Sequence, residues 1–510
     1  MGDVRAPWRF GTLECLSLAA AALLGILNLP QPFDGDQALF MTGAREFDAG
    51  KVLYKDFWDL KPPGIYAFYL LAGELFGFNE IGLHFFELVY LLAFAAFLTA
   101  TLRDRFRRPE TAALLPLLTV GLYYAVVRKW HLTQVEGLVG PLLYASLWFA
   151  VGRDEGKGGA WIPRLLISGA AGGMALLFKP MFALILLPFW WTAIVQVPSI
   201  RNEPAALRVV RRGLAILAGA ALAVAPAVGY FVRHGCLDLA YRTLFVIPPK
   251  VLAIAPRKSF LDFARNAGWF VLAFAPAIAL ALPGLRTPLR KPRDLVLVHL
   301  LAWLLLGAVI ILLQKTSWWG YHYLLLTVPI GVFAARGIED LQDRWSAGLP
   351  KAKAALGGAA FLALCSFGLV TLIGKVVDLG VCGFALTRKS AGEFRARVYP
   401  VYREAAEETA FLSASRSLPG GIFVAGNPVF YHVSGREQAL VLNGWALEYF
   451  LPEQWVELRG EIGSGKAAYL YLVAEVWNSL PGFQPELRRT IEERYALLRG
   501  NDAGCWFVRR

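Results

Sequence analysis

Residues 30–79 hold a group of carboxylates and cations directly after the first apolar run of the chain. Within this segment, Asp36 follows a turn broken by proline and glycine and precedes a helical pattern. A carboxylate at that position could accept a proton from an attacking hydroxyl group. Aspartate is also a favoured helix N-cap, so the sequence is equally compatible with that structural role for Asp36. Asp34, two residues earlier, is a further candidate for lining the same site.

The tripeptide Lys61-Pro62-Pro63 opens a second helical pattern in the same segment. Proline suits the first turn of a helix, where a helix carries partial positive charge. A lysine immediately before it adds a full charge, which favours a phosphate site. The alternative to a phosphate site is that Lys61 is an interfacial lysine that simply precedes a helix beginning with proline.

Further polar and aromatic residues fall at the ends of apolar runs. Lys315 and His322 are candidates for binding a phosphate, and aromatic side chains nearby could line a sugar or lipid site. Aromatic belts and snorkelling cations at membrane interfaces are the competing interpretation. The histidines lack ligand spacing, so no metal site is predicted. The remaining lining candidates are Arg128, Trp318, Trp319, Tyr321 and Tyr323.

The composition indicates which elements must position these residues. Of the 510 residues, 57% are hydrophobic and only 17% are charged. Soluble chains carry about 25% charged residues. Many apolar runs approach the ~20 residues that cross a bilayer as a helix. The sequence therefore predicts an all-α polytopic membrane domain and excludes disordered and fibrous classes.

Eleven crossings are predicted, together with one short helix. The apolar run 64–77 is too short to span, so we expect it to lie on the outer face as a juxtamembrane helix. The spans are expected near 13–29, 80–102, 111–127, 135–151, 165–178, 180–197, 214–232, 266–285, 295–313, 321–335 and 356–375.

The net charge of +13 is consistent with membrane orientation. With a cytoplasmic N-terminus, Lys and Arg are about twice as dense in the inside segments as in the outside ones. This pattern disfavours nucleic-acid binding. It places 30–79 in the first periplasmic loop and the C-terminus outside. The first span has no small-residue cleavage site, so it is expected to be an uncleaved anchor.

Residues 376–510 have soluble composition and form the predicted second domain, after a transmembrane domain at 1–375. A helix at 402–415, strands at 422–425 and 469–474, and a closing hairpin predict a small extracytoplasmic α/β domain. The hairpin is expected to turn between Asn501 and Gly504. The sequence does not decide whether Cys382 and Cys505 form a disulfide. The stretch GEIGSGKA at 460–467 lacks the hydroxyl residue of a nucleotide-binding loop and is interpreted as an ordinary loop.

Several motifs in order resemble the C-type glycosyltransferases that use polyprenyl-phosphate sugars, such as the protein O-mannosyltransferases and the bacterial aminoarabinose transferase. DGDQALFMTGAREFDAG resembles the Asp-Glu-x-x-Tyr loop of that family, followed by KPP. FGFNEIGLHFFELVYLL resembles the entry to its second span. LLFKPMFALILLP and KTSWWGYHYLLLTVP resemble its later stretches.

The resemblance implies roles for individual residues. Asp36 matches the catalytic carboxylate, Lys61 matches a residue that binds the donor phosphate, and Glu136 matches the second acidic position. The chain also departs from the family pattern. Gln37, Phe40 and His84 stand where glutamate, tyrosine and arginine are usual.

The expected function is inverting transfer of a hexosyl or pentosyl group from a polyprenyl-phosphate carrier to a hydroxyl acceptor on a lipid, glycan or protein. The expected location is a bacterial inner membrane. The expected partners are the donor, the acceptor and membrane lipids. No cofactor is expected, and a divalent metal is left open. A transporter or flippase of lipid-linked saccharides and a non-catalytic scaffold are the alternatives. The sequence does not identify the sugar, the acceptor or the carrier.

Overall fold

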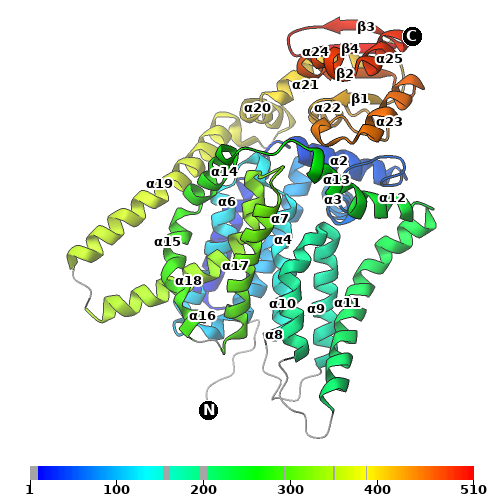
Figure 1. The fold of residues 1–510 in the computed structure, drawn as a ribbon. Helices are drawn as coiled ribbons and strands as arrows, with labels where there is room; N and C mark the ends of the chain where they lie inside the picture. The colour runs from blue at the N-terminus through cyan, green and yellow to red at the C-terminus, as the bar shows by residue number, and fades with distance from the viewer. Residues whose placement is uncertain (1–9, 153–160, 196–203, 291–292, 349–350, 386) are drawn as a thin grey trace. The chain divides into compact units, whose positions relative to one another are not determined.

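A computed structural model describes residues 10–152, 161–195, 204–290, 293–348, 351–385 and 387–510, which are mostly helical with one small sheet (Figure 1). Packing divides the chain into two compact units. The first, called the helical unit, contains Met1–Leu29, His84–Pro226 and Lys258–Val381. The second, called the mixed unit, contains Pro30–Leu83, Ala227–Arg257 and Cys382–Arg510.

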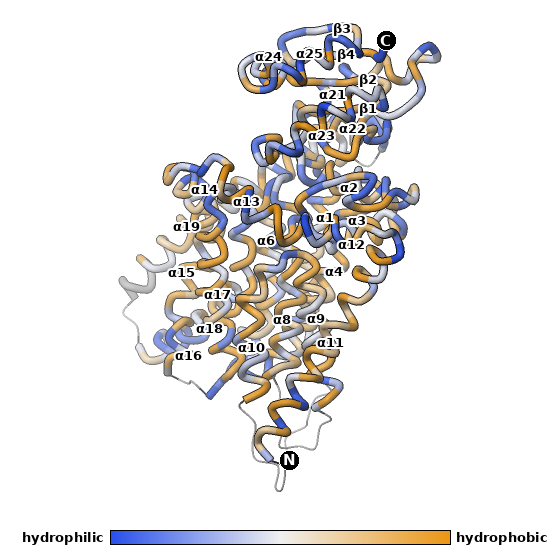
Figure 2. The backbone as a smooth tube through the Cα atoms, turned by 45° about the vertical axis from the view of Figure 1, so that its right-hand side comes forward, coloured by the Kyte–Doolittle hydropathy of each residue, from blue (hydrophilic) through white to orange (hydrophobic). Residues whose placement is uncertain are grey.

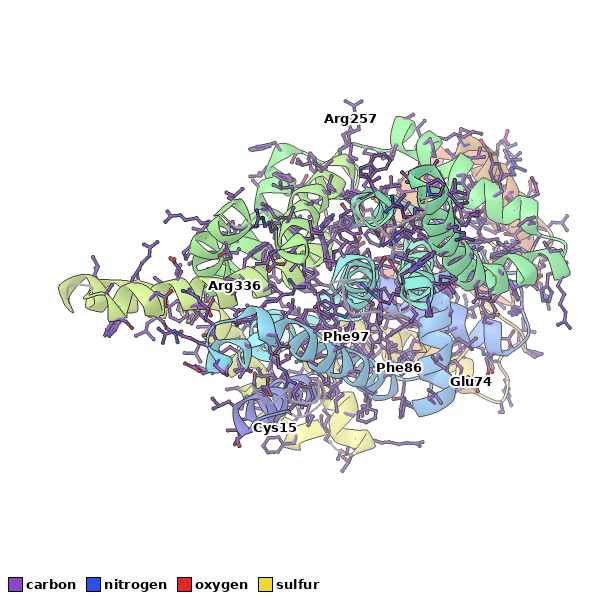
Figure 3. The ribbon with its side chains drawn as sticks, turned by 90° about the horizontal axis from the view of Figure 1, so that it is seen from below. Cys15, Glu74, Phe86, Phe97, Arg257 and Arg336 are labelled. Carbon is purple, nitrogen blue, oxygen red and sulfur yellow. The ribbon has the colours of Figure 1, made fainter. Side chains whose placement is uncertain are left out.

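The helical unit consists of apolar helices, whose hydrophobic residues run along most of their length (Figure 2). Figure 3 shows them in end view, with Phe86 and Phe97 on α4 and Arg336 on α18. The helices are α1 (Thr12–Ile26), α4 (Glu80–Leu102), α5 (Pro109–Ala112), α6 (Leu122–Val126), α7 (Val135–Leu138), α8 (Gly140–Val151), α9 (Trp161–Phe178), α10 (Ala183–Val195), α11 (Ala205–Arg233), α14 (Phe260–Ala273), α15 (Ala275–Gly284), α16 (Arg286–Arg290), α17 (Leu295–Leu313), α18 (Thr327–Ser346) and α19 (Lys351–Val381). Short turns connect them, namely η1 (Arg103–Arg105), η2 (Leu117–Gly121), η3 (Lys129–His131), η5 (Pro180–Phe182) and η7 (Gly320–Leu326).

Six helices among the described residues are long and apolar enough to cross a membrane, and a seventh candidate is α14 with α15, which bend by 79°. Three shorter apolar segments are α1, Val135–Val151 and Pro180–Val195. Each of the eleven predicted spans coincides with a helical segment. Breaks shorten several of them, as in α5, η2 and α6, where a π-helical turn interrupts the α-helix. The count of eleven crossings stays a prediction.

Glycines allow close approach between helices of this unit. A Cβ on Gly169 would lie 2.0 Å from the backbone oxygen of Ile216, so α9 and α11 meet backbone to backbone. A Cβ on Gly284 would lie 2.0 Å from the oxygen of Phe333, which brings α15 equally near α18. Small residues at crossings are typical of helix packing in membranes.

The mixed unit contains short helices and a four-stranded sheet in the order β1-β2-β4-β3. Strand β1 pairs parallel with β2, whereas β4 is antiparallel to both β2 and β3. The strands are β1 (Ile422–Ala425), β2 (Tyr469–Val473), β3 (Tyr495–Gly500) and β4 (Gly504–Arg509). The helices are α2 (Gly35–Asp48), α3 (Pro63–Phe76), α12 (Leu237–Tyr241), α13 (Ile247–Ile254), α20 (Arg388–Val398), α21 (Val401–Thr409), α22 (Val429–Ser434), α23 (Pro452–Gly463), α24 (Ala474–Phe483) and α25 (Pro485–Arg494), with turns η6 (Arg242–Val246), η8 (Gly383–Ala385), η9 (Ala410–Ser413) and η10 (Leu447–Tyr449).

The predicted elements of the C-terminal domain are confirmed. Strands form at 422–425 and 469–473, and the hairpin closes where the amide of Asn501 donates to the oxygen of Gly504. The predicted helix at 402–415 is observed as α21 followed by η9. Tyr471 on β2 and Trp506 on β4 are buried and contact each other, because they are direct partners in the register.

Residues 30–83 pack with the C-terminal segment. The amide of Trp58 donates to the oxygen of Val441 at 2.8 Å, and Nδ2 of Asn443 donates to the oxygen of Trp58 at 2.7 Å. The indole of Trp58 donates to Thr243. Packing therefore groups three segments that are far apart in the chain. The boundary after residue 375, which was predicted from hydropathy, instead divides the last of these segments from the other two.

Two expectations require correction. All five cysteines are free, so the disulfide left open between Cys382 and Cys505 does not form. Cys505 lies within β4, where it pairs with Leu472 on one side and Gly500 on the other. The 460–467 stretch is also only partly a loop, because Gly460–Gly463 is the last turn of α23.

Candidate active site

Asp34 is the N-cap of α2. Its amide donates to Oε1 of Gln37 at 2.7 Å, which is part of a reciprocal capping box. Asp36 lies within the first turn, so the alternative in which Asp36 is the cap is wrong. The departure at Gln37 has a local reason, because an amide side chain can serve as the third residue of a capping box.

Asp36 contacts two side chains from distant parts of the mixed unit. The indole Nε1 of Trp445 donates to Oδ1 of Asp36 at 2.8 Å, and the Lys61 ammonium lies 4.0 Å from Oδ2. The side chains of Asp36 and Lys61 are 20% and 33% exposed, so both can reach a ligand. Gly35 has no room for a side chain, since a Cβ there would lie 2.3 Å from the Trp445 ring. The Trp445 ring therefore fits against the start of α2 because residue 35 is glycine.

Lys61 is positioned by the residues on either side of it. Its backbone oxygen accepts a hydrogen bond from the hydroxyl of Tyr54 at 2.8 Å, and Pro62 after it is the N-cap of α3. Its ammonium lies 5.7 Å from the centre of the Phe40 ring. An aromatic face attracts a cation without competing for its hydrogen bonds. Phe40, which stands where the resembled family has tyrosine, therefore contacts the Lys61 ammonium through its ring and offers it no hydroxyl oxygen.

Asp59 is a further carboxyl at this position, and the sequence did not distinguish it from its acidic neighbours. Its Oδ2 accepts a hydrogen bond from Tyr66 at 2.9 Å. Burial raises the pKa of Asp59 above its ordinary value, and the Asp36 charge raises it further, while Lys61 opposes the shift. Asp36, Asp59 and Lys61 therefore form one electrostatic group. The available signal was spacing, because Asp59 lies two residues before Lys61.

Trp445 was also missed from the sequence. Its amide donates to Oδ1 of Asn443 at 3.0 Å, and the next residue, Ala446, adopts a left-handed backbone with φ of 59°. Asn443 in turn donates to Trp58, so the turn that carries Trp445 is fastened to the first loop. No local pattern marks Trp445, because its function depends on a contact with a residue 409 positions away.

The start of α2 is anchored from the C-terminal segment as well. The hydroxyl of Tyr402 donates to Oε1 of Glu80 at 2.8 Å and accepts from the amide of Phe33 at 2.8 Å. Burial, followed by the charge of Asp34, raises the pKa of Tyr399 strongly. Asp34 therefore caps α2 and also interacts with the half-buried Tyr399.

The helical unit holds a second group of predicted residues. Glu136, at the start of α7, is buried and accepts a hydrogen bond from Nζ of Lys179 at 2.8 Å. Nε2 of His322 lies 3.8 Å from the same carboxylate oxygen, and Lys179 also donates to Gln314. The ends of α9 and α17 and the turn η7 supply these partners. Glu136 and His322 are thus brought together. Lys179 donates both to the Glu136 carboxylate and to the side-chain amide of Gln314.

The remaining predicted residues of the helical unit lie around η7. Trp318 meets Phe263 edge to face, Trp319 lies under the ammonium of Lys258, Tyr321 meets His322 edge to face, and Tyr323 stacks on Phe270. The backbone oxygen of Lys315 accepts from the amide of Lys258. Arg128 is exposed and lies over the rings of Trp130 and Phe367. Among the described residues, no group of three or more His, Cys, Asp or Glu side chains could hold a metal ion.

The predicted site residues thus form two sets. Asp34, Asp36 and Lys61 belong to the mixed unit, and all the others belong to the helical unit.

The fold is similar to that of two solved structures of ArnT, in agreement with the resemblance found in the sequence. The crystal structure of ArnT from Cupriavidus metallidurans bound to undecaprenyl phosphate is similar to this chain at a TM-score of 0.62, with 13% sequence identity and 97% of each chain covered. The apo structure of the same protein gives a TM-score of 0.62 at 12% identity, again covering 97% of each chain. No protein-family model and no curated protein matches the chain.

Proposed function

We propose that this protein transfers a sugar from a polyprenyl-phosphate carrier to a hydroxyl acceptor. The observation that carries the proposal is the pairing of Asp36 with Lys61, 4.0 Å apart and both partly exposed at adjacent helix starts. One group can take a proton and the other can neutralise a phosphate. The ArnT-like fold supports the same conclusion, since the similar structure is bound to undecaprenyl phosphate.

The proposed reaction is a single displacement with inversion at the anomeric carbon. The acceptor oxygen forms a bond to that carbon as the bond from carbon to the phosphate oxygen breaks. The hydroxyl proton passes to Asp36, and the electron pair of the broken bond leaves with the polyprenyl phosphate. Lys61 stabilises the negative charge that develops on this leaving group. Trp445 fixes one oxygen of Asp36 and so orients the carboxylate.

Asp59 is assigned a positioning role in this proposal. It is half-buried and accepts a hydrogen bond from Tyr66, and its charge acts on Lys61. A carboxyl with a raised pKa holds less negative charge near the substrate phosphate than an ordinary aspartate. Asp36 is therefore the carboxylate proposed to act as the base.

Glu136 is proposed to act through Lys179 and His322. Its carboxylate is buried and paired with Lys179 at 2.8 Å, which makes it a poor proton acceptor and a good anchor for two cationic groups. His322 and Lys315 are the proposed phosphate-binding residues of this unit. Arg128, Trp318, Trp319, Tyr321 and Tyr323, together with Asp34 in the mixed unit, are proposed to line the substrate path.

The remaining proposals concern context. The chain is proposed to be a multi-pass protein of a bacterial inner membrane, with a cytoplasmic N-terminus and a periplasmic C-terminus. The donor carries a hexosyl or pentosyl group, and the acceptor is a lipid, glycan or protein. Lys61 supplies the positive charge at the leaving group, so no cofactor is proposed. Transfer measured with and without a chelator tests the role of a divalent metal.

The test is transfer by the purified protein from polyprenyl-phosphate sugars to candidate acceptors. Asp36→Asn and Lys61→Met are expected to lower transfer at least about a hundredfold, since each removes a charge used in the transition state. Asp48→Asn and Lys55→Met make the same changes at exposed positions and should retain transfer. Undiminished transfer by both site variants would refute the proposal. Movement of the intact lipid-linked sugar across vesicles without transfer would favour a flippase instead.

A further inference from the structure

Lys375 is a buried cation in α19, where most side chains of Leu356–Val381 are exposed or half-buried and Leu379 is the other buried residue. Its side chain is only 7% exposed. Its ammonium donates to Oδ1 of Asn28 at 2.9 Å and to the backbone oxygen of Tyr124 at 2.8 Å. Both acceptors are neutral, and an ammonium has three donors. Neither the hydrogen bonds nor the ion pairs of the described residues give Lys375 a carboxylate partner.

The acceptors of Lys375 lie where two helices end. Asn28 follows α1, and Tyr124 lies in the last turn of α6, against which α19 packs (Figure 1). The oxygen of Tyr124 has lost its usual partner four residues on, because the amide of Arg128 instead donates to Nδ1 of His131. Helix ends of this kind carry partial negative charge. Two carbonyl dipoles hold the lysine in place but do not neutralise it.

Arg128 adds a second positive charge at the same place. It is exposed and lies over the ring of Phe367, two turns before Lys375 on α19. Its charge acts on both Lys375 and His131, which is buried and stacked on Trp269 with ring centres 3.7 Å apart. Water screens the repulsion between the exposed Arg128 and the buried Lys375 only in part, and an anion bound between them would offset it. Buried ionisable groups in membrane proteins mark functional sites.

We propose that Lys375 and Arg128 form a phosphate-binding site at the end of the helical unit where α1 and α6 finish. The ligand is a phosphate monoester or diester. Lys375 supplies an inner donor held by two neutral oxygens, and Arg128 supplies an outer guanidinium that can bind two phosphate oxygens. The apolar exposed face of α19 beside the site is suited to the hydrocarbon chains of a lipid. The site uses no residue of the mixed unit, to which Lys61 belongs.

Binding is measured on the full chain in a neutral detergent, with every variant built on Lys61→Met so that the proposed donor position does not contribute. The probes are phosphatidylglycerol, dodecyl phosphate, inorganic phosphate and, as a neutral lipid, diacylglycerol. Native mass spectrometry counts the bound molecules, and the thermal-unfolding midpoint follows the titration. A ligand that binds the folded state raises that midpoint by an amount that grows logarithmically with the ligand concentration relative to its Kd.

Arg128→Gln is expected to weaken binding of the phosphate-bearing lipids at least tenfold, while Lys129→Gln, the same charge change next to it, stays within twofold. Diacylglycerol should not bind. Inorganic phosphate that binds with the same dependence on Arg128 identifies free phosphate as a ligand, whereas binding of the lipids alone identifies a headgroup. Lys375→Gln should lose binding and Lys375→Arg should keep it, and Arg128→Gln decides if these two fail to fold. Equal binding by the Arg128→Gln protein, or an equal loss in the Lys129 variant, would overturn the proposal.

Discussion

The indole of Trp445 donates a 2.8 Å hydrogen bond to Oδ1 of Asp36 across 409 residues of chain. The tryptophan comes from the C-terminal segment and the aspartate from the first loop, and both belong to the mixed unit. The C-terminal segment therefore contributes directly to the candidate active site. It is more than an appended soluble domain, because it orients the carboxylate proposed to act as base.

Trp445→Phe removes this hydrogen bond and keeps most of the ring. A hydrogen bond to a charged group contributes about 1.5–3 kcal/mol, so kcat is expected to fall roughly ten- to a hundredfold. KM for the donor should change little, because Lys61 is untouched. Steady-state transfer kinetics provide the measurement. Trp477→Phe, on α24 beside Arg488, is the control and should leave kcat unchanged. A normal kcat for the Trp445 variant would show that Asp36 needs no such orientation.

Gly35→Ala is expected to displace Trp445 and to lower both stability and transfer. The added Cβ would start 2.3 Å from the indole ring, within the first turn of α2. Overpacking of this kind costs about 1–3 kcal/mol. Thermal unfolding in detergent and transfer assays measure the two effects. Gly460→Ala in α23 meets nothing within 4 Å, and it should be neutral or slightly stabilising. Equal behaviour of the two variants would contradict the close packing at Gly35.

Asp59 predicts a pH dependence of stability. Burial raises its pKa in the folded state, so the folded protein binds this proton more tightly than the unfolded chain does. The resulting cost is fully present above the folded pKa and disappears as the pH falls through it towards the unfolded value. Asp59→Asn removes that cost while keeping an acceptor for Tyr66. The stability of the variant relative to the parent should therefore increase with pH. Unfolding midpoints of both proteins between pH 4 and 8 test this, and a difference that stayed constant would exclude it.

Glu136, which is buried, and Lys179, which is 25% exposed, should behave as a coupled pair. Removing one partner of a fully buried pair costs about 3–5 kcal/mol, because the other charge is left uncompensated, and the exposure of Lys179 makes a somewhat smaller loss the expectation here. Glu136→Gln and Lys179→Met should each destabilise the protein strongly, and the double variant should recover much of the loss. Thermal unfolding of the four proteins gives the coupling energy. Strictly additive losses would show that the 2.8 Å contact contributes little.

The proposed orientation is tested by reporter fusions. A reporter fused after residue 108 should report the cytoplasm, and one fused after residue 400 should report the periplasm, because cations are concentrated in the segments assigned to the inside. A reporter fused after residue 55 should also report the periplasm. An external signal at 108 would invert the proposed threading.

The sequence by itself determined the elements of this fold. Hydrophobic runs and period-two alternation are local properties, so every predicted span coincides with a helical segment, and the strands at 422–425 and 469–473 form where they were expected. It also singled out Asp36 and Lys61, since both follow local signals for a helix start. Glu136 and His322 were proposed separately, and no local pattern placed them against each other.

The tertiary structure alone decided how these residues are used. Asp34 and not Asp36 caps α2, with the amide of Asp34 donating to Oε1 of Gln37. The sequence allowed either aspartate at the cap, and the folded loop selects Asp34. Trp445 reaches Asp36, and Lys179 joins Glu136, through contacts between segments far apart in the chain. Lys375 is an unremarkable residue in an apolar run until α19 packs against α6. Periodicity sets which face of an element is buried, whereas the partner of a buried polar group depends on packing between elements, which no local pattern encodes.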